Sequence, residues 1–248
     1  MIPEAIATLT HLPQKSREAI QGYTVKLTEG LSDNLVSIIL FGSAVGSDFI
    51  EGKSDINILI TLLNARAADL NIIMDIGRKF VKKGLAVPLI FEEDHIKTSL
   101  DTFPIEFSDM KRRHVVLFGV DPLENAVIEG KNLRYQCERE LKSLVVNLRR
   151  GFLKTEDKGE AIQELLEGSL SSLLASCRGL VWLSGKTPPD GAEMLLGAIK
   201  DEYNTSTSAM LRVWELRKGK SGATATLEAI FDDYTAEIDR LTGIVDRL

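Results

Sequence analysis

The segment LFGSAVGSDFIEGKSDINILI, residues 40–60, joins two apolar runs through a loop of small and charged residues. The run that leads into it is Leu35–Phe41, LVSIILF, and the run that follows is Ile56–Leu63, INILITLL. Both are short and rich in β-branched and large apolar residues, which is typical of buried strands. The segment therefore predicts two strands of one sheet, with a Gly-Ser pair after the first strand and Asp-Ile-Asn at the start of the second.

The rest of the first half alternates helical and strand patterns. Helical spacing of apolar residues predicts helices over Gln14–Leu31 and Ala65–Lys83, and two further apolar runs predict strands over Leu85–Phe91 and His114–Gly119. Pro88 interrupts the third of the four predicted strands, and because proline has no N–H group it favours an edge strand or a bulge. We therefore expect an α/β (α+β) domain with a small mixed sheet.

From Leu133 onward the strand signals disappear and apolar residues recur at helical spacing. The pattern predicts an all-α, up-and-down bundle of four or five helices. The predicted division is an α/β domain over residues 1–125 and a helical bundle over residues 126–248. The last amphipathic pattern, Leu227–Val245, is compatible with internal packing and with formation of a homodimer, and composition does not separate the two.

Composition limits the classes of function. The 30 Lys and Arg residues and 36 Asp and Glu residues give a net charge of −6, which disfavours a general nucleic-acid coat. Cys137 and Cys177 both lie in apolar helical patterns, so we expect buried thiols in a reducing compartment, not a disulfide or a metal cluster. The N-terminal segment lacks a secretory pattern, and no apolar run is long enough to span a bilayer, so we expect a cytoplasmic protein without a membrane partner.

The order of the motifs in the first half resembles the nucleotidyltransferase superfamily, which has the DNA polymerase beta-like fold. Gly42 and Ser43 follow the first predicted strand, Gly46 lies in the loop, and the sequence SDIN, residues 54–57, opens the second strand. The resemblance covers roughly the first 120 residues and includes the intervening helix and the later strands. It implies a nucleotidyltransferase-like domain that binds a nucleoside triphosphate (NTP).

The resemblance also implies roles for individual residues. Two residues that are one apart on a strand point to the same face, so Asp55 and Asn57 would lie at one metal position. In an active member, carboxylates at these positions hold Mg²⁺ ions that bridge the triphosphate. The Gly42-Ser43 turn would bind phosphate oxygens through backbone N–H groups and a hydroxyl, and Lys53 is a cation placed within the same loop.

Two departures from the family pattern affect the metal site. Asn57 stands where the family has its second aspartate, and Pro88 stands where the third strand is expected to carry an acid. Two of the three expected carboxylates are then missing, and one carboxylate is a poor anchor for Mg²⁺. Glu92 is the nearest substitute acid, although an acid directly after a strand more often solvates a loop or caps the next helix.

Two functional hypotheses remain open at the level of sequence. On ligand chemistry we prefer a catalytically degenerate relative that retains a cleft for a nucleotide or a protein partner. The alternative is an active, Mg²⁺-dependent enzyme that transfers a nucleoside monophosphate to a hydroxyl of an unidentified acceptor. The basic cluster Lys111–Arg113 suits nucleotide phosphates, an RNA backbone or a solvated turn. His11, His95 and His114 are too scattered for a zinc site.

Overall fold

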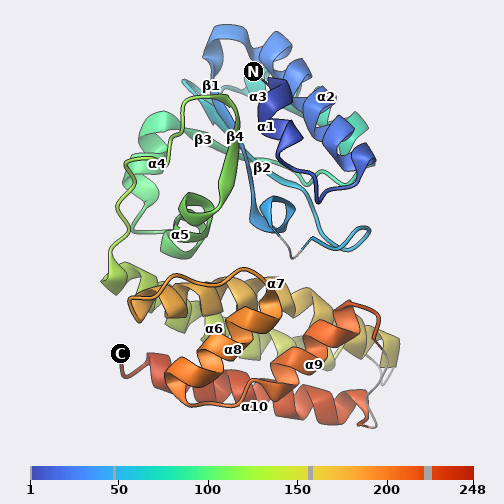
Figure 1. The fold of residues 1–248 in the computed structure, drawn as a ribbon, viewed down its shortest axis with the longest axis vertical. Coiled ribbons are helices and arrows are strands. Elements are labelled where there is room, and N and C mark those ends of the chain that lie inside the picture. Colours follow the sequence, from blue (N-terminus) through green and yellow to red (C-terminus); the bar gives the residue numbers. More distant parts are fainter. Residues whose placement is uncertain (1, 47–48, 156–158, 221–224) are drawn as a thin grey trace. The chain divides into compact units, whose positions relative to one another are not determined.

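The computed structural model describes residues 2–46, 49–155, 159–220 and 225–248. The chain forms two compact units, Met1–Thr102 with Phe107–Ile128 and Phe103–Glu106 with Glu129–Leu248 (Figure 1). The break at Ile128 falls just after the boundary expected between residues 125 and 126. The assignment of each unit as an independent domain stays a prediction.

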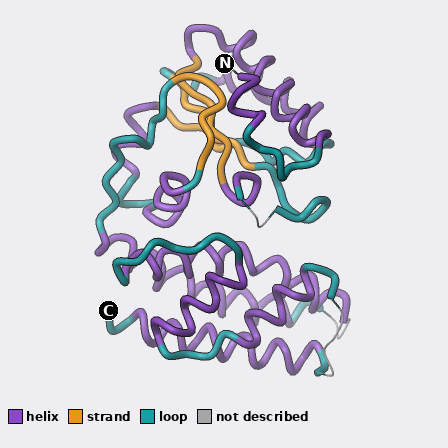
Figure 2. Tube along the Cα trace, viewed as in Figure 1, coloured by secondary structure: helices purple, strands orange, loops and turns teal. Residues whose placement is uncertain are grey.

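A four-stranded mixed sheet organises the first unit, as the sequence predicts (Figure 2). Its strands are β1 (Leu35–Phe41), β2 (Asn57–Leu62), β3 (Leu89–Glu92) and β4 (His114–Gly119), in the order β3-β2-β1-β4. The central strand β1 pairs antiparallel with β2 and β4, whereas β2 and β3 are parallel. The apolar run of β1 is long because this strand is buried between two neighbours and two layers of helices.

Helices cover both faces of the sheet (Figure 1). The helices of this unit are α1 (Ile2–Ala7), α2 (Gln14–Leu31), α3 (Ala67–Val81) and α4 (Glu93–Ser99), together with α5 (Pro104–Arg112) from Phe107 onward. Ile38 and Leu40 of β1 belong to one core cluster with residues of α2 and α3. Ile39, which points to the opposite face, belongs to a second cluster with residues of α4 and α5. The alternation of β1 therefore builds two cores, one on each side of the sheet.

The third strand begins later than predicted, at Leu89 instead of Leu85. Leu85 forms an isolated bridge with Ile56, and regular pairing resumes only where Leu89 meets Leu59. The approach to β3 thus contains one residue more than the matching part of β2, which is the irregularity that proline favours. Pro88 lies in this irregular segment of an edge strand, as its missing N–H group leads us to expect.

The second unit is helical within its described residues. Its helices are α6 (Gly130–Phe152), α7 (Gly159–Leu183), α8 (Ala192–Tyr203), α9 (Ser208–Arg217) and α10 (Leu227–Val245). The apolar stripes predicted from the sequence face the core of this unit, and Cys137 and Cys177 are buried there as free thiols. In the part of the chain that the structure describes, none of the helices combines the length and apolar character needed to cross a membrane.

The buried thiols make the stability of the helical unit sensitive to alkali. Burial raises the pKa of Cys137 and of Cys177 to about 12, whereas an exposed thiol has a pKa of about 8.5. Between these values the unfolded chain has lost thiol protons that the native chain retains, so the free energy of unfolding falls as the pH rises. The thiol contribution is complete below about pH 8.5 and is lost through the window above it.

We therefore expect a lower urea midpoint at about pH 9.5 than at about pH 8, a range that lies below the pKa of an ordinary tyrosine at about 10. Cys177→Ala should make this difference between the two pH values smaller, because only one raised thiol remains. A midpoint that is the same at both pH values in the native sequence would contradict the prediction. Rapid reaction of the two thiols of the folded chain with a disulfide reagent at about pH 8 would also contradict the prediction.

Candidate functional site

The Gly-Ser pair forms a tight turn at the end of β1. Residues Gly42–Val45 make a short 3₁₀ turn, in which the Gly46 N–H donates a hydrogen bond to the Ser43 carbonyl at 3.0 Å. Gly42 has a φ of +77°, in the left-handed region that glycine adopts at little cost. The His11 imidazole contacts the carbonyl oxygen of the fully buried Ala44 through Nε2 at 3.0 Å. The turn is therefore closed by a backbone hydrogen bond of its own and is contacted in its middle by the His11 side chain.

Asn57 lies directly beside this turn. In the sheet register Phe41 pairs with Asn57, so the last residue of β1 faces the first residue of β2. A Cβ atom on Gly42 would lie 3.2 Å from Asn57 Nδ2. The structure thus brings together Gly42, Ser43 and Asn57, which are three of the predicted site residues. Their assignment as a ligand site stays a prediction.

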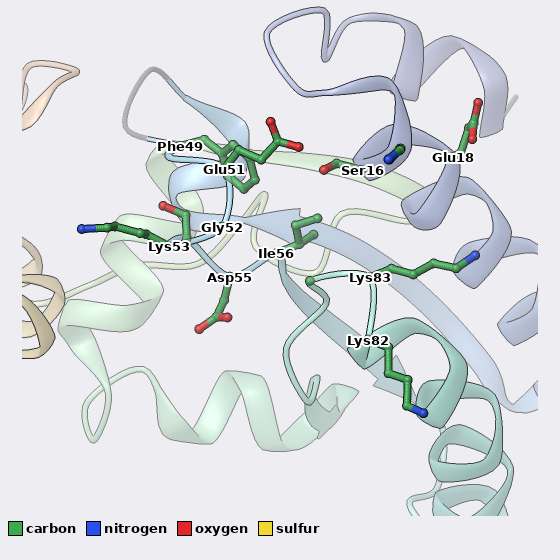
Figure 3. Close-up of a pocket in the computed structure, with 13 residues that line it drawn as sticks. Ser16, Glu18, Phe49, Glu51, Gly52, Lys53, Asp55, Ile56, Lys82 and Lys83 are labelled. Carbon is green, nitrogen blue, oxygen red and sulfur yellow. The ribbon is translucent and has the colours of Figure 1, made fainter. Parts of the chain in front are cut away.

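Asp55 and Lys53 instead line a pocket of about 540 Å³ within the first unit. The other walls come from the first turn of α2 and the loop after α3, and the full lining is Lys15, Ser16, Glu18, Phe49, Glu51, Gly52, Lys53, Ser54, Asp55, Ile56, Lys82, Lys83 and Gly84. Figure 3 shows the Asp55 carboxylate pointing away from Phe49 and Glu51. The Gly42-Ser43 turn is not part of this lining. The five predicted residues therefore divide into a turn group and a pocket group.

The residues that would hold Mg²⁺ do not form a complete set. Residues 85–91, which approach and form β3 beside the start of β2, contain no acid, and Val87 is 81% exposed there. Asp55 is then the one carboxylate from the expected three positions, and Asn57 contributes a neutral amide. Among the described residues no group of three or more His, Cys, Asp or Glu side chains could hold a metal ion. The described side chains therefore do not fit the Mg²⁺ site that the resemblance implies.

Glu92 does not replace the missing acid. Its Oε1 accepts a hydrogen bond from the Ala65 N–H at 2.8 Å, ahead of α3. In the parallel register Glu92 pairs with Leu62, at the opposite end of β2 from Asn57. The two ends are five residue steps apart along the strand, roughly 16 Å. Glu92 thus has the structural role that an acid directly after a strand usually has.

The other acids near the third strand also have local partners. Glu93 and Asp94 pair with Lys97, Asp101 accepts from Thr102, Glu106 accepts from Gln136, and Asp109 pairs with Arg112. None of these contacts lies at the Gly42 turn or at the described lining of the Asp55 pocket. The acids in this part of the sequence therefore support helices and loops.

The basic cluster Lys111–Arg113 does not form a solvated turn, because Lys111 and Arg112 end helix α5. Lys111 donates from Nζ to the Ala126 carbonyl at 2.5 Å, and Arg112 pairs with Asp109 at 3.3 Å. The Arg113 guanidinium group occupies the space where a side chain on Gly46 would begin, with Nη2 2.6 Å from the Cβ position. The sequence indicated the cluster but not which of its members reaches the Gly-Ser turn.

The three histidines have separate surroundings, as their spacing predicts. His11 contacts the Gly-Ser turn, and His95 lies edge-on to the Phe91 ring at a centroid distance of 5.3 Å. His114, the first residue of β4, contacts the Met110 carbonyl through Nδ1 at 2.8 Å and Asp121 through Nε2 at 3.2 Å. His114 thus fastens the start of β4 to the end of α5.

Comparison with known proteins identifies a fold but not a close relative. No family model matches the chain, and no curated protein matches its sequence. Among solved structures the chain is similar to the spectinomycin adenyltransferase AAD(9) from Enterococcus faecialis, whose crystal structure contains ATP and spectinomycin. The similarity has a TM-score of 0.60 and 15% sequence identity, and it covers 92% of this chain and 98% of the other. At this identity the match shows the fold alone, and that fold is the one of a nucleotidyltransferase.

Proposed function

We propose that the protein binds a nucleoside triphosphate at the Gly42–Val45 turn and does not transfer its nucleotidyl group. The observation that carries this proposal is a preserved turn beside an altered ligand set. Gly42 keeps a left-handed backbone with Asn57 directly against it, and residues 85–91 offer no acid to the same end of the sheet. Phosphate binding needs the first feature, whereas metal-assisted transfer needs the carboxylates.

The turn has the chemistry of an anion site. A glycine with positive φ at the start of a tight turn leaves room for a phosphate to approach the backbone. Ser43 is partly exposed and carries a hydroxyl next to the same backbone. The similar fold of AAD(9), described with bound ATP, supports a nucleotide as the ligand.

The loop between β1 and β2 also borders a space of suitable size. The pocket beside Asp55 and Lys53 has a volume of about 540 Å³, within the range of roughly 300–1,000 Å³ that is usual for small-molecule sites. Its lining mixes lysines with carboxylates and an aromatic side chain, which suits a polar ligand better than an apolar one. The pocket therefore supports a binding role for this loop.

Calorimetric titration with ATP, GTP, CTP and UTP, each with Mg²⁺ and with a chelator, tests the proposal. We expect at least one of them to bind, with an affinity that Mg²⁺ changes by less than about threefold, roughly 0.6 kcal/mol. We also expect no release of pyrophosphate with candidate hydroxyl acceptors. Binding that Mg²⁺ strengthens, together with pyrophosphate release that Asp55→Ala abolishes, would establish the enzymatic alternative. Absence of binding for all four would refute nucleotide binding.

Asn57→Asp should create a stronger Mg²⁺ site if residues 55 and 57 face one metal position. A second carboxylate should raise the affinity for Mg²⁺, measured without nucleotide, by about tenfold or roughly 1.4 kcal/mol. Asn64→Asp is a suitable control, because Asn64 lies in the exposed loop after β2. Equal Mg²⁺ affinities in the two variants would mean that Asp55 and Asn57 do not share a metal position.

A further inference from the structure

The sheet register places Arg113 next to the Gly-Ser turn. Phe41 pairs with His114 across the antiparallel strands β1 and β4. In such a pair, the residue before His114 lies alongside the residue after Phe41, which is Gly42. The Arg113 N–H is bonded to the Asp109 and Met110 carbonyls at 3.1 and 3.2 Å, so its backbone is fixed by the last turn of α5. The sheet and the helix together direct this arginine to the turn.

The side chain completes the contact. Three guanidinium atoms of Arg113, Nη1, Cζ and Nη2, are the nearest heavy atoms to the Cβ position of Gly46. Gly46 is also the residue whose N–H closes the turn onto Ser43. Because Gly46 has no side chain, the planar group can lie against the backbone at the exit of the turn. The geometry thus places the Arg113 guanidinium at the turn that we propose as the phosphate site.

The negative charge of a phosphate group explains why a cation is useful at the Gly42–Val45 turn. Phosphate groups need positive charge around them, and a divalent metal ion normally supplies it in this fold class. The expected metal positions hold Asn57 and apolar residues in place of two carboxylates. An arginine needs no carboxylates to hold it, is always charged, and matches phosphate oxygens with two parallel N–H groups.

We propose that Arg113 binds the phosphate groups of a nucleotide at the Gly42–Val45 turn and supplies the positive charge that Mg²⁺ would otherwise supply. This inference rests on the proposed nucleotide binding and adds the residue that makes binding independent of metal. Of the cluster Lys111–Arg113, Arg113 is the residue whose guanidinium atoms are the nearest heavy atoms to the Gly46 Cβ position.

The experiment compares four variants in ATP titrations carried out in a chelator. Arg113→Ala should weaken ATP binding by at least tenfold, and Arg113→Lys should give an intermediate value, because it keeps the charge but loses the planar fork. Gly46→Ala keeps the arginine but displaces its guanidinium, so it should weaken binding severalfold. The control Arg78→Ala should bind ATP as the native chain does, since Arg78 is exposed on α3 and pairs with Asp75 on the surface.

Inorganic triphosphate is the second probe, and it separates phosphate recognition from recognition of the base and ribose. If the variants bind triphosphate with the same order of affinities as they bind ATP, the effect of Arg113 is on the phosphates. A loss of affinity in the Arg113 variants that is seen with ATP alone would overturn the phosphate assignment.

Hydrogen exchange over residues 36–46 in the ligand-free variants separates binding from support of the turn. Faster exchange in Arg113→Ala and Arg113→Lys alike, with equal losses of affinity, would mean that Arg113 only supports the turn and would overturn the proposal.

The outcomes distinguish this inference from the function on which it rests. A native chain that binds ATP, with Arg113→Ala and Gly46→Ala binding it equally well, would overturn the role of Arg113 and leave nucleotide binding intact. A native chain that binds neither ATP nor the other nucleotides would overturn both. If Arg113→Ala does not fold, Gly46→Ala and Arg113→Lys still decide the question.

Discussion

Gly119→Ala should destabilise the first unit by about 4 kcal/mol, a large part of the roughly 5–15 kcal/mol by which a typical domain is stable. Gly119 ends β4 with a φ of +77°, where an L-residue is strained by roughly 1–2 kcal/mol. A Cβ atom there would also lie 2.9 Å from the Val36 carbonyl carbon and 3.0 Å from Ser37 Cα, and still closer to the Val36 oxygen. These are backbone atoms of the central strand. The end of β4 therefore has to leave its pairing with β1.

Hydrogen exchange is the appropriate measurement, because it reports separately on the strands of the first unit. Peptides that contain β1 and β4 should lose protection in Gly119→Ala. Gly52→Ala is a matched control, because Gly52 has a φ of +79° but no atom within 4 Å of its Cβ position. The control should lose only the protection that corresponds to backbone strain at a positive φ. Equal loss of protection in the two variants would mean that contact with β1 contributes nothing.

Glu237→Ala should have the second largest effect and should act on the helical unit. Glu237 is 2% exposed, and its Oε2 accepts hydrogen bonds from the Ala209 and Met210 N–H groups at 3.0 Å each. These N–H groups lie in the first turn of α9, where the helix itself provides no acceptor. Its Oε1 accepts from the Ser206 and Ser208 hydroxyls at 2.5 and 3.1 Å. Truncation leaves two buried N–H groups without an acceptor, which costs about 3 kcal/mol.

Tryptophan fluorescence during urea unfolding can measure this loss selectively. Trp182 and Trp214, the two tryptophans of the chain, lie in α7 and α9, so their emission follows the helical unit. Asp239→Ala on the same helix is the control. Asp239 is exposed and pairs with Arg149 at 2.8 Å on the surface, an interaction worth about 0–1 kcal/mol. If both variants unfold at the same urea concentration, Glu237 does not hold the start of α9.

Local patterns in the sequence were sufficient for most of the fold. β1 and β4 occupy the predicted residues, because each is an apolar run bounded by turn residues. The helical half follows from the 3.6-residue period of its apolar residues, which marks the buried face of each helix. The predicted start of β3 was wrong, because the register between Leu85 and Leu89 depends on pairing with β2 and on the effect of Pro88, not on hydrophobicity.

The parts of the candidate site that could not be predicted depend on contacts between distant residues. A pattern of charges placed Arg113 in a basic cluster, but only the pairing of β1 with β4 brings it to Gly46, far away in the sequence. Glu237 was not singled out for a related reason. Its position on α10 gives no sign that the first turn of α9 meets its carboxylate. Helical and strand periodicities report burial, whereas these partners are set by tertiary packing.

The absence of a side chain at Gly46 has an evolutionary consequence. Because the Arg113 guanidinium fills that space, the two positions should change together when the sequence diverges. A homologue with a larger residue in place of Gly46 should have a shorter or uncharged residue in place of Arg113. Where that exchange has occurred, we expect acids at the position of Asn57 and in β3. The pair would then distinguish sequences that, on our proposal, neutralise phosphate with arginine from those that use a metal ion.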